Sequence, residues 1–251
     1  MKFVFLRRRY LAAVACALAA AAMFYVVNHP AIVGAAAATR QLPIYCVQRD
    51  QKMAALTFDA AWGNEDTQQL IDILARYNVK ATFFVVGDWV EKYPESVKAL
   101  HDAGHEVMSH SNHHDHFNSL TADQIVADLA ACGDKIQAVT GVRPTLFRPP
   151  YGEYDDHVIS AVRSAGIEPI QWDVDSLDWK DLSAPEITRR VTGKVQPGSI
   201  VLFHNAAKHT PEALPAILEN LIGQGYTLVP VSQLILTGEY TIDHTGRQCP
   251  A

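Results

Sequence analysis

The chain has 251 residues, of which 49% are hydrophobic and 19% are charged, with 13 prolines and 14 glycines. This is the composition of an ordinary globular protein, and it excludes a collagen-like, low-complexity or disordered chain. Beyond residue 39 the chain has 17 basic against 27 acidic residues, and this net charge of −10 excludes a general affinity for nucleic acid.

The first 39 residues differ from the rest of the chain. They hold four basic and no acidic residues, and the 18 residues from Tyr10 to Val27 are apolar throughout. This pattern is typical of a signal peptide or a membrane anchor, and we favour an uncleaved anchor with the following domain outside the cytoplasm. Cleavage at the small residues from Gly34 to Ala38, which would secrete the domain, is the alternative, and a buried core helix is the least favoured interpretation.

From residue 53 onward, short apolar runs alternate with longer amphipathic segments. The pattern predicts strands at 53–58, 81–86, 105–110, 145–148, 169–174, 199–204 and 226–231. It predicts helices at 66–77, 94–103, 121–141, 155–165, 183–194 and 210–225. Strict alternation indicates parallel strands with crossover helices, so we expect one α/β domain over residues 40–238, as a barrel or an open sheet. The polar residues 239–251 are expected to form an irregular tail.

Three cysteines lie outside the apolar N-terminal run. Cys132 falls in a helical pattern and is expected to be buried and inert. Cys46 and Cys249 stand at the two ends of the predicted domain, and domain termini often lie close together. Because an extracytoplasmic site permits disulfides, we predict a Cys46–Cys249 bridge.

A histidine-rich stretch follows the third predicted strand. It places four imidazoles within the seven residues from His110 to His116. His110 and His114 are spaced to face one metal ion, and neutral imidazole is the commonest protein metal ligand. The alternative is a solvated polar loop that happens to be rich in histidine.

Reactive side chains recur at the carboxyl ends of the predicted strands. They are Asp59, His110, Arg148, Asp175 with Asp178, and His204. Each alone has a structural explanation, such as a helix cap, an ion pair or a buried histidine. Together they occupy the face on which barrel active sites are built, so the sequence predicts a catalytic site there.

Five ordered motifs resemble those of the polysaccharide deacetylases, which are carbohydrate esterase family four with a NodB-type domain. They are Thr57–Ala60, His110–His114, Arg148–Gly152, Asp175–Trp179 and Leu202–His204. The resemblance implies a distorted (β/α)7 barrel, a divalent metal and removal of N-acetyl groups from amino sugars. The variant first motif is most similar to the sporulation-associated and clostridial-type branch of the family.

The resemblance also assigns the metal and the acid–base groups. His110 and His114 would hold a divalent metal, Zn²⁺ first, with Co²⁺, Ni²⁺ and Mn²⁺ as alternatives. Asp59 would be the general base, and Arg148 would keep it ionised. His204 would protonate the leaving nitrogen, which requires a cationic imidazole. Asp178 would raise the pKa of His204 and orient its ring.

Three further residues would form the substrate pocket. The backbone N–H of Tyr151 would stabilise the oxyanion of the tetrahedral intermediate. Trp179 and Leu202 would enclose the acetyl methyl group, although simple core packing also explains a tryptophan at position 179.

The first motif departs from the family pattern at its fourth residue. The family's second aspartate, normally the third metal ligand, is Ala60 here, and two imidazoles alone make a weak catalytic zinc site. Several residues are candidates to replace it: Asp59, Glu65, Asp66, His113, Asp115 and His116.

The sequence therefore predicts a metal-dependent deacetylase of cell-wall amino-sugar polymers, either peptidoglycan or a chitin-like glycan. An alternative is a glycan-binding envelope protein that has lost catalysis, which Ala60 would explain. A third interpretation is hydrolysis of another small amide. The expected partners are wall glycan and, through residues 1–39, the membrane.

Overall fold

The computed structural model describes residues 10, 13–21, 23, 25 and 40–251. The chain divides into two units, Met1–Arg40 and Gln41–Ala251. In the first unit residues 10, 13–21, 23 and 25 are helical, but much of the predicted anchor and all of the predicted cleavage stretch lie outside the described residues. Among the residues described, no helix is both long and apolar enough to cross a bilayer.

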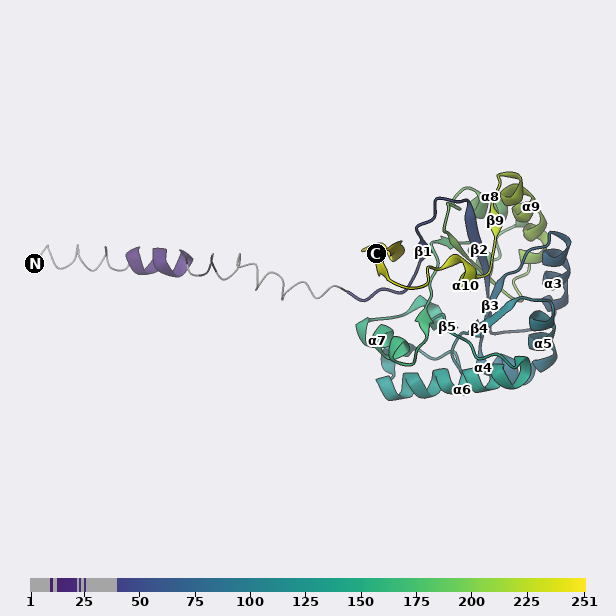
Figure 1. The fold of residues 1–251 in the computed structure, drawn as a ribbon, viewed down its shortest axis with the longest axis horizontal. Coiled ribbons are helices and arrows are strands. Elements are labelled where there is room, and N and C mark those ends of the chain that lie inside the picture. The colour runs from purple at the N-terminus through teal and green to yellow at the C-terminus, as the bar shows by residue number, and fades with distance from the viewer. Residues whose placement is uncertain (1–9, 11–12, 22, 24, 26–39) are drawn as a thin grey trace, which may run out of the picture. The chain divides into compact units, whose positions relative to one another are not determined.

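The second unit is organised around one parallel sheet (Figure 1). Its strand order is β6-β5-β4-β3-β2-β8-β7, and β9 pairs with β2 outside this path. The strands are β2 (Met53–Ala60), β3 (Thr82–Val85), β4 (Glu106–Ser109), β5 (Leu146–Phe147), β6 (Glu168–Pro169), β7 (Val174–Asp175), β8 (Ile200–His204) and β9 (Thr227–Leu228). The sheet curls into a half-barrel with β6 and β7 at its edges, which confirms the expected α/β fold of distorted barrel type.

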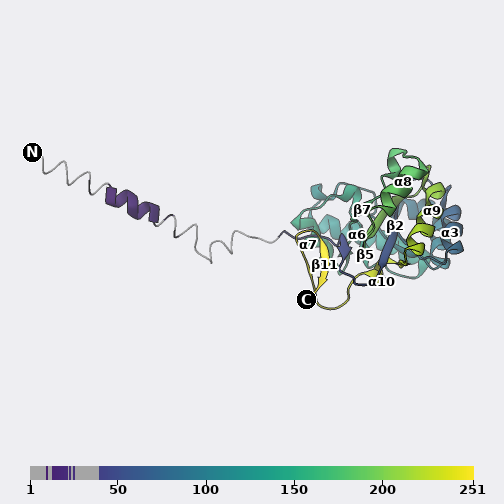
Figure 2. The same ribbon diagram turned by 90° about the horizontal axis from the view of Figure 1, so that it is seen from above.

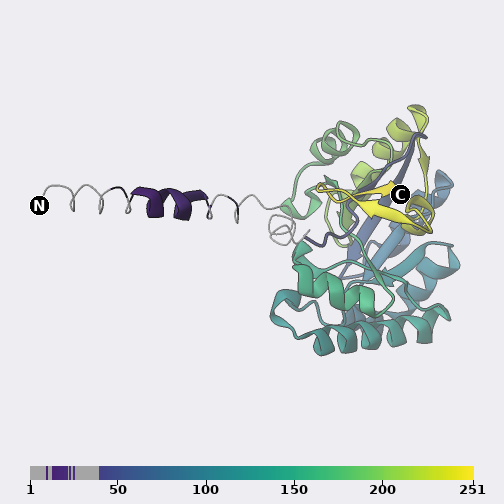
Figure 3. The same cartoon turned by 60° about the vertical axis from the view of Figure 1, so that its left-hand side comes forward.

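Helices α3 to α9 lie around the outside of the sheet (Figures 1 and 3), whereas Val231 and Leu234 of α10 pack with Ala55 on its inner face. The helices are α3 (Thr67–Arg76), α4 (Gly87–Lys92), α5 (Pro94–Asp102), α6 (Ala122–Thr140), α7 (Asp156–Ser164), α8 (Ala184–Thr192), α9 (Thr210–Gly223) and α10 (Val231–Leu234). Short 3₁₀ turns are η1 (Phe117–Ser119), η2 (Pro150–Gly152) and η3 (Asp178–Lys180). The helix predicted at 121–141 is α6, and Thr121 and Gln124 form a reciprocal capping box at its start.

The central strand β2 shows how the sheet separates core from site. Leu56 and Phe58 point outward into the core that the helices cover. Ala55 belongs to the inner core, and side chains alternate along a strand, so Thr57 and Asp59 point into the half-barrel. The inner core is therefore apolar at the bottom of the strands and polar at their carboxyl ends.

The predicted strand at 169–174 is divided into β6 and β7, and the half-barrel is open between them. The segment before β2 fills part of this gap. Ile44 N donates to Pro169 O at 3.0 Å, and Val47 N donates to Gly198 O at 2.9 Å. These bonds satisfy backbone groups on both sides of the opening, which a closed barrel would pair between strands.

The expectation of an irregular tail is wrong. Residues 239–251 contain β10 (Tyr240–Ile242) and β11 (Arg247–Pro250), and β11 pairs in parallel with β1 (Cys46–Val47), as Figure 2 shows. The buried Gln248 side chain ties the tail down, since its Oε1 accepts from Leu236 N at 2.7 Å. The tail is thus part of the domain, although its composition is polar.

The predicted Cys46–Cys249 disulfide is also wrong, because both cysteines are free. In the register of the two strands Cys46 lies opposite Arg247, so Cys249 is two residues further along β11. Diagonal neighbours of this kind lie too far apart for an unstrained bridge. Cys132 is buried as expected, and burial raises the pKa of its thiol to about 12.

Candidate active site

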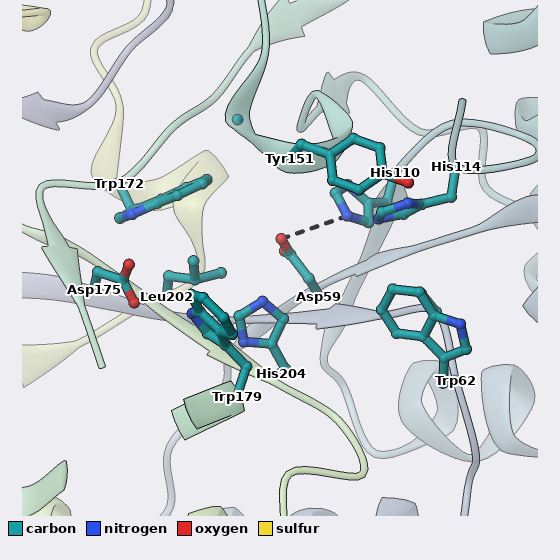
Figure 4. A pocket seen from close by; sticks show the side chains of 12 residues that line it. Asp59, Trp62, His110, His114, Tyr151, Trp172, Asp175, Trp179, Leu202 and His204 are labelled. Atoms are coloured by element: carbon teal, nitrogen blue, oxygen red, sulfur yellow. Dashed lines mark ion pairs between the residues drawn. The ribbon is translucent and has the colours of Figure 1, made fainter. Parts of the chain in front are cut away.

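The residues at the carboxyl ends of the strands surround one cavity of about 470 Å³, which is within the usual size range of ligand pockets (Figure 4). Seven of the nine predicted site residues line it: Asp59, His110, His114, Tyr151, Trp179, Leu202 and His204. The other two, Arg148 and Asp178, are buried and bind lining residues from behind.

Asp59 and Arg148 form a buried ion pair below the cavity. Arg148 Nη1 donates to Asp59 Oδ1 at 2.7 Å and to the Thr57 hydroxyl at 2.8 Å. Burial by itself raises the pKa of Asp59, but the charge and hydrogen bond of Arg148 outweigh it and hold that pKa below its usual range. Asp59 is therefore an ionised carboxylate at neutral pH, with Oδ2 free of Arg148.

His110 faces this carboxylate. Its Nδ1 donates to Arg148 O at 2.7 Å, which leaves a lone pair on Nε2, 3.5 Å from Asp59 Oδ2. The ring centroid of His114 lies 5.0 Å from that of His110, in an edge-on arrangement. Burial lowers the pKa of both histidines, to about 4 for His114, so both imidazoles are neutral at neutral pH.

The loop that carries His114 is sharply bent at this residue. His114 has a φ of 61°, and its backbone N–H donates to the Ser111 hydroxyl at 2.8 Å. A positive φ costs a residue with a side chain free energy, and the surrounding contacts hold it in place. The bend turns the His114 ring toward His110 and into the cavity (Figure 4).

The chemistry of these donors fits a divalent cation with two ligands. Neutral imidazoles are good metal ligands, and the Nδ1–H of His110 bonds to a backbone carbonyl, as is usual for a ligating histidine. Within the described part of the chain, however, no group of three histidine, cysteine or acidic side chains is arranged to hold a metal. The site is therefore one protein ligand short of a usual catalytic zinc site.

The candidate replacements for the ligand missing at Ala60 do not converge on the two histidines. The His113 ring pairs with Asp88 at 2.9 Å, and that of His116 pairs with Glu153 at 2.9 Å. One oxygen of Asp66 accepts from Ala206 N, one oxygen of Glu65 accepts from Asn64 N, and Asp115 is exposed. Of the six candidates, Asp59 is the one that the structure places next to a predicted ligand.

His204 stands on the other side of Asp59, at the end of β8. Its Nδ1 lies 2.8 Å from Asp178 Oδ1, and its backbone N–H and the Thr210 hydroxyl both donate to Asp178 Oδ2. Burial lowers the pKa of His204, but the hydrogen bond and the charge of Asp178 outweigh burial and raise it overall. The remaining ring nitrogen, Nε2, is the one available to the cavity.

Aromatic and aliphatic side chains form the walls of the cavity. Leu202 is buried, whereas Trp179 and Tyr151 are each 57% exposed. Tyr151 has a φ of 60°, and its ring stacks on His116 with the centroids 4.3 Å apart. Its backbone N–H donates to no described residue. This N–H is therefore free to donate a hydrogen bond to an oxygen atom in the cavity.

Comparison with known proteins decides the family. The family profile described as polysaccharide deacetylase matches residues 47–170. The peptidoglycan-N-acetylmuramic acid deacetylase PdaA of Bacillus subtilis is 31% identical over 78% of this chain and 76% of that protein. The chain belongs to the polysaccharide deacetylase family. Its place in the sporulation-associated or clostridial-type branch stays a prediction.

Two further relatives from B. subtilis are longer than this chain. The uncharacterized protein YlxY is 33% identical over 77% of this chain, which spans 60% of YlxY. The peptidoglycan-N-acetylmuramic acid deacetylase PdaC is 37% identical over 75% of this chain, which spans 40% of PdaC. Similarity therefore concerns the deacetylase domain and not these whole proteins.

A solved structure of similar fold comes from a protein described as a family-four pseudoenzyme of Bacillus anthracis. It is 36% identical, with a TM-score of 0.74, over 76% of this chain and 68% of that one. A mutant of the same protein is described as having restored enzymatic activity, at 37% identity over 76% of this chain and 70% of that one, with a TM-score of 0.74. Polysaccharide deacetylase folds thus occur with and without activity.

Sequence reasoning missed residues that shape the cavity. Trp62, Ala61 and Trp172 line it, although none belongs to the motif residues given a role. Asn205 was also missed; its amide donates to Trp62 O and Gly63 O, and it accepts from Ala61 N at 3.2 Å. Its position directly after His204 could have indicated a role for Asn205, because the site residues lie at the strand ends on this face.

Proposed function

We propose that this polysaccharide deacetylase is an extracytoplasmic, metal-dependent hydrolase that removes N-acetyl groups from the amino sugars of peptidoglycan. The observation that carries the proposal is the pairing of opposite groups across one cavity. Asp59 is held as an anion by Arg148, and His204 is held toward its cationic form by Asp178. The similarity to PdaA and PdaC, both named as peptidoglycan-N-acetylmuramic acid deacetylases, supports peptidoglycan as the substrate class, ahead of a chitin-like glycan.

Hydrolysis of an acetamide needs a proton acceptor for water and a proton donor for the departing amine. Asp59 would accept the proton of the attacking water, since its pKa lies below its usual range and it is ionised. His204 would donate a proton to the leaving nitrogen from Nε2, while Asp178 holds Nδ1. A divalent cation held by His110 and His114, Zn²⁺ or alternatively Co²⁺, Ni²⁺ or Mn²⁺, would supply Lewis acidity.

The walls of the cavity suit the acetyl group. Leu202 and Trp179 provide an apolar surface for the methyl group. Leu202 lies on β8, two residues before His204. The free backbone N–H of Tyr151 would bind the oxygen on which negative charge develops. This arrangement favours a small N-acyl group over a larger one.

Metal removal tests the proposal directly. The full chain incubated with peptidoglycan or N-acetylglucosamine oligomers is expected to release acetate, and dialysis against a chelator is expected to abolish the release. Added Zn²⁺, Co²⁺, Ni²⁺ or Mn²⁺ should restore it, because two imidazole ligands bind such ions reversibly. Acetate assay and elemental analysis are the measurements. Full activity in protein free of metal would overturn the metal dependence.

A second candidate is a glycan-binding envelope protein without catalysis. Ala60 favours it, as does the similarity to the B. anthracis pseudoenzyme. Glycan binding without acetate release at any metal concentration would select this function. In both cases we propose that the domain lies outside the cytoplasm, that residues 1–39 provide a membrane anchor or signal peptide, and that nucleic acid is no partner.

The acidic role of His204 predicts a particular pH dependence. His204 is cationic at pH values below its raised pKa and loses its proton as the pH rises through that pKa. Acetate release should therefore fall at pH values above the pKa of His204. Asp178→Asn keeps the shape but removes the charge that raises this pKa. We expect the alkaline limb of the kcat/KM profile to move to lower pH in this variant. An unmoved limb would contradict the role of Asp178.

A further inference from the structure

Trp62 is an exposed tryptophan at the mouth of the cavity. It is 64% exposed, more than Trp179 or Tyr151, and it lines the same cavity. The other large hydrophobic residues of 40–251 that are exposed, Val126, Val142 and Ile222, do not line it. Exposed aromatic surface gathered at one cavity indicates a binding surface, whereas single exposed aliphatic residues are ordinary.

The backbone around Trp62 is fastened on both sides. Asn205 donates to Trp62 O at 2.6 Å and to Gly63 O at 2.8 Å, while Trp89 Nε1 also donates to Gly63 O. Gly63 has a φ of 59°, and a Cβ there would collide with the side chain of Glu65. The loop therefore presents an uncovered indole from a fixed backbone, which lowers the entropy cost of binding a ligand.

The position of Trp62 defines which part of a ligand it would meet. Its ring contacts that of His114 edge-on, with the centroids 5.1 Å apart. Figure 4 shows Trp62 and Trp179 on opposite sides of Asp59, with Trp179 next to His204. A ligand whose acetyl group lies between Leu202 and Trp179 would thus extend past His114 to reach Trp62.

We propose that Trp62 is a stacking platform for the sugar unit next to the one that is deacetylated, on the His114 side of the site. The axial C–H groups of a pyranose ring form an apolar face that packs on an indole, and its rim hydroxyls stay in water. Aromatic surfaces on both sides of the reacting groups select a glycan chain over a single amino sugar. This inference rests on the proposed function for the place of the acetyl group.

Binding measurements test it separately from catalysis. The full chain with His204→Ala, which does not consume the probe, is titrated with the N-acetylglucosamine tetramer and with the monosaccharide. Trp62→Ala in this background is expected to weaken tetramer binding about tenfold and to leave monosaccharide binding unchanged. Trp62→Phe should retain most of the affinity, since a flat apolar ring remains.

The controls separate the outcomes. Ile222→Ala removes another exposed apolar side chain, on α9 and outside the cavity, and should not change either affinity. Unchanged tetramer binding in Trp62→Ala, or an equal loss for tetramer and monosaccharide, would overturn the platform. If the unmutated chain never releases acetate but Trp62→Ala still weakens tetramer binding, the role of Trp62 as a platform would be supported. The proposed deacetylase activity would be contradicted.

Discussion

Replacing His204 by alanine is expected to lower acetate release by about 10²–10⁴-fold, the usual contribution of a positioned general acid. The departing amine is a poor leaving group unless a proton reaches its nitrogen as the bond breaks. His204 is held for this by Asp178, which accepts from its Nδ1 side at 2.8 Å and from its backbone N–H at 2.9 Å. The measurement is kcat on an N-acetylglucosamine oligomer.

A matched control for His204→Ala is His209, which directly precedes α9. His209 also pairs with a carboxylate, since its Nδ1 lies 3.2 Å from Glu212, but it does not line the cavity. His209→Ala should leave kcat unchanged. If His204→Ala and His209→Ala release acetate equally fast, then His204 is not the acid. A folded His204→Ala protein that still binds glycan would show that the loss lies in the chemical step.

The positions of the reactive residues could be predicted because parallel strands end on one face. Asp59, His110 and His204 were placed at strand ends from the alternation of apolar and amphipathic segments, and β2, β4 and β8 end at or next to them. The ordered motifs added the family, and the cavity brings these side chains together. Their mutual hydrogen bonds could not be predicted, because they depend on side-chain orientation across strands.

Three features lay beyond the reach of local patterns. The division of residues 169–174 between β6 and β7 follows from the opening of the half-barrel, which is a property of the whole sheet. The pairing of β11 with β1 joins Cys46 to Arg247, 201 positions apart in the sequence, and the polar composition of the tail gives no sign of a strand. The two ends of the domain do lie side by side, as expected. The register of the pairing nevertheless separates Cys46 from Cys249, so the predicted disulfide does not form.

Arg148→Met is expected to lower the free energy of unfolding by about 3–5 kcal/mol, the typical cost of leaving one member of a buried ion pair without its partner. Arg148 is fully buried, and its guanidinium lies 4.2 Å from the ring centroid of Phe84. Methionine fills part of that space but makes no bond to Asp59. Urea unfolding of the two full chains measures the difference.

The surface offers the matched control for this substitution. Arg143 pairs with Asp134 at 2.6 Å, but both side chains are largely exposed, so Arg143→Met should cost at most about 1 kcal/mol. Adding Asp59→Asn to Arg148→Met removes the stranded charge and should recover part of the lost stability. Equal losses in Arg148→Met and Arg143→Met would show that the Asp59–Arg148 pair is not the buried charge pair on which the proposed base depends.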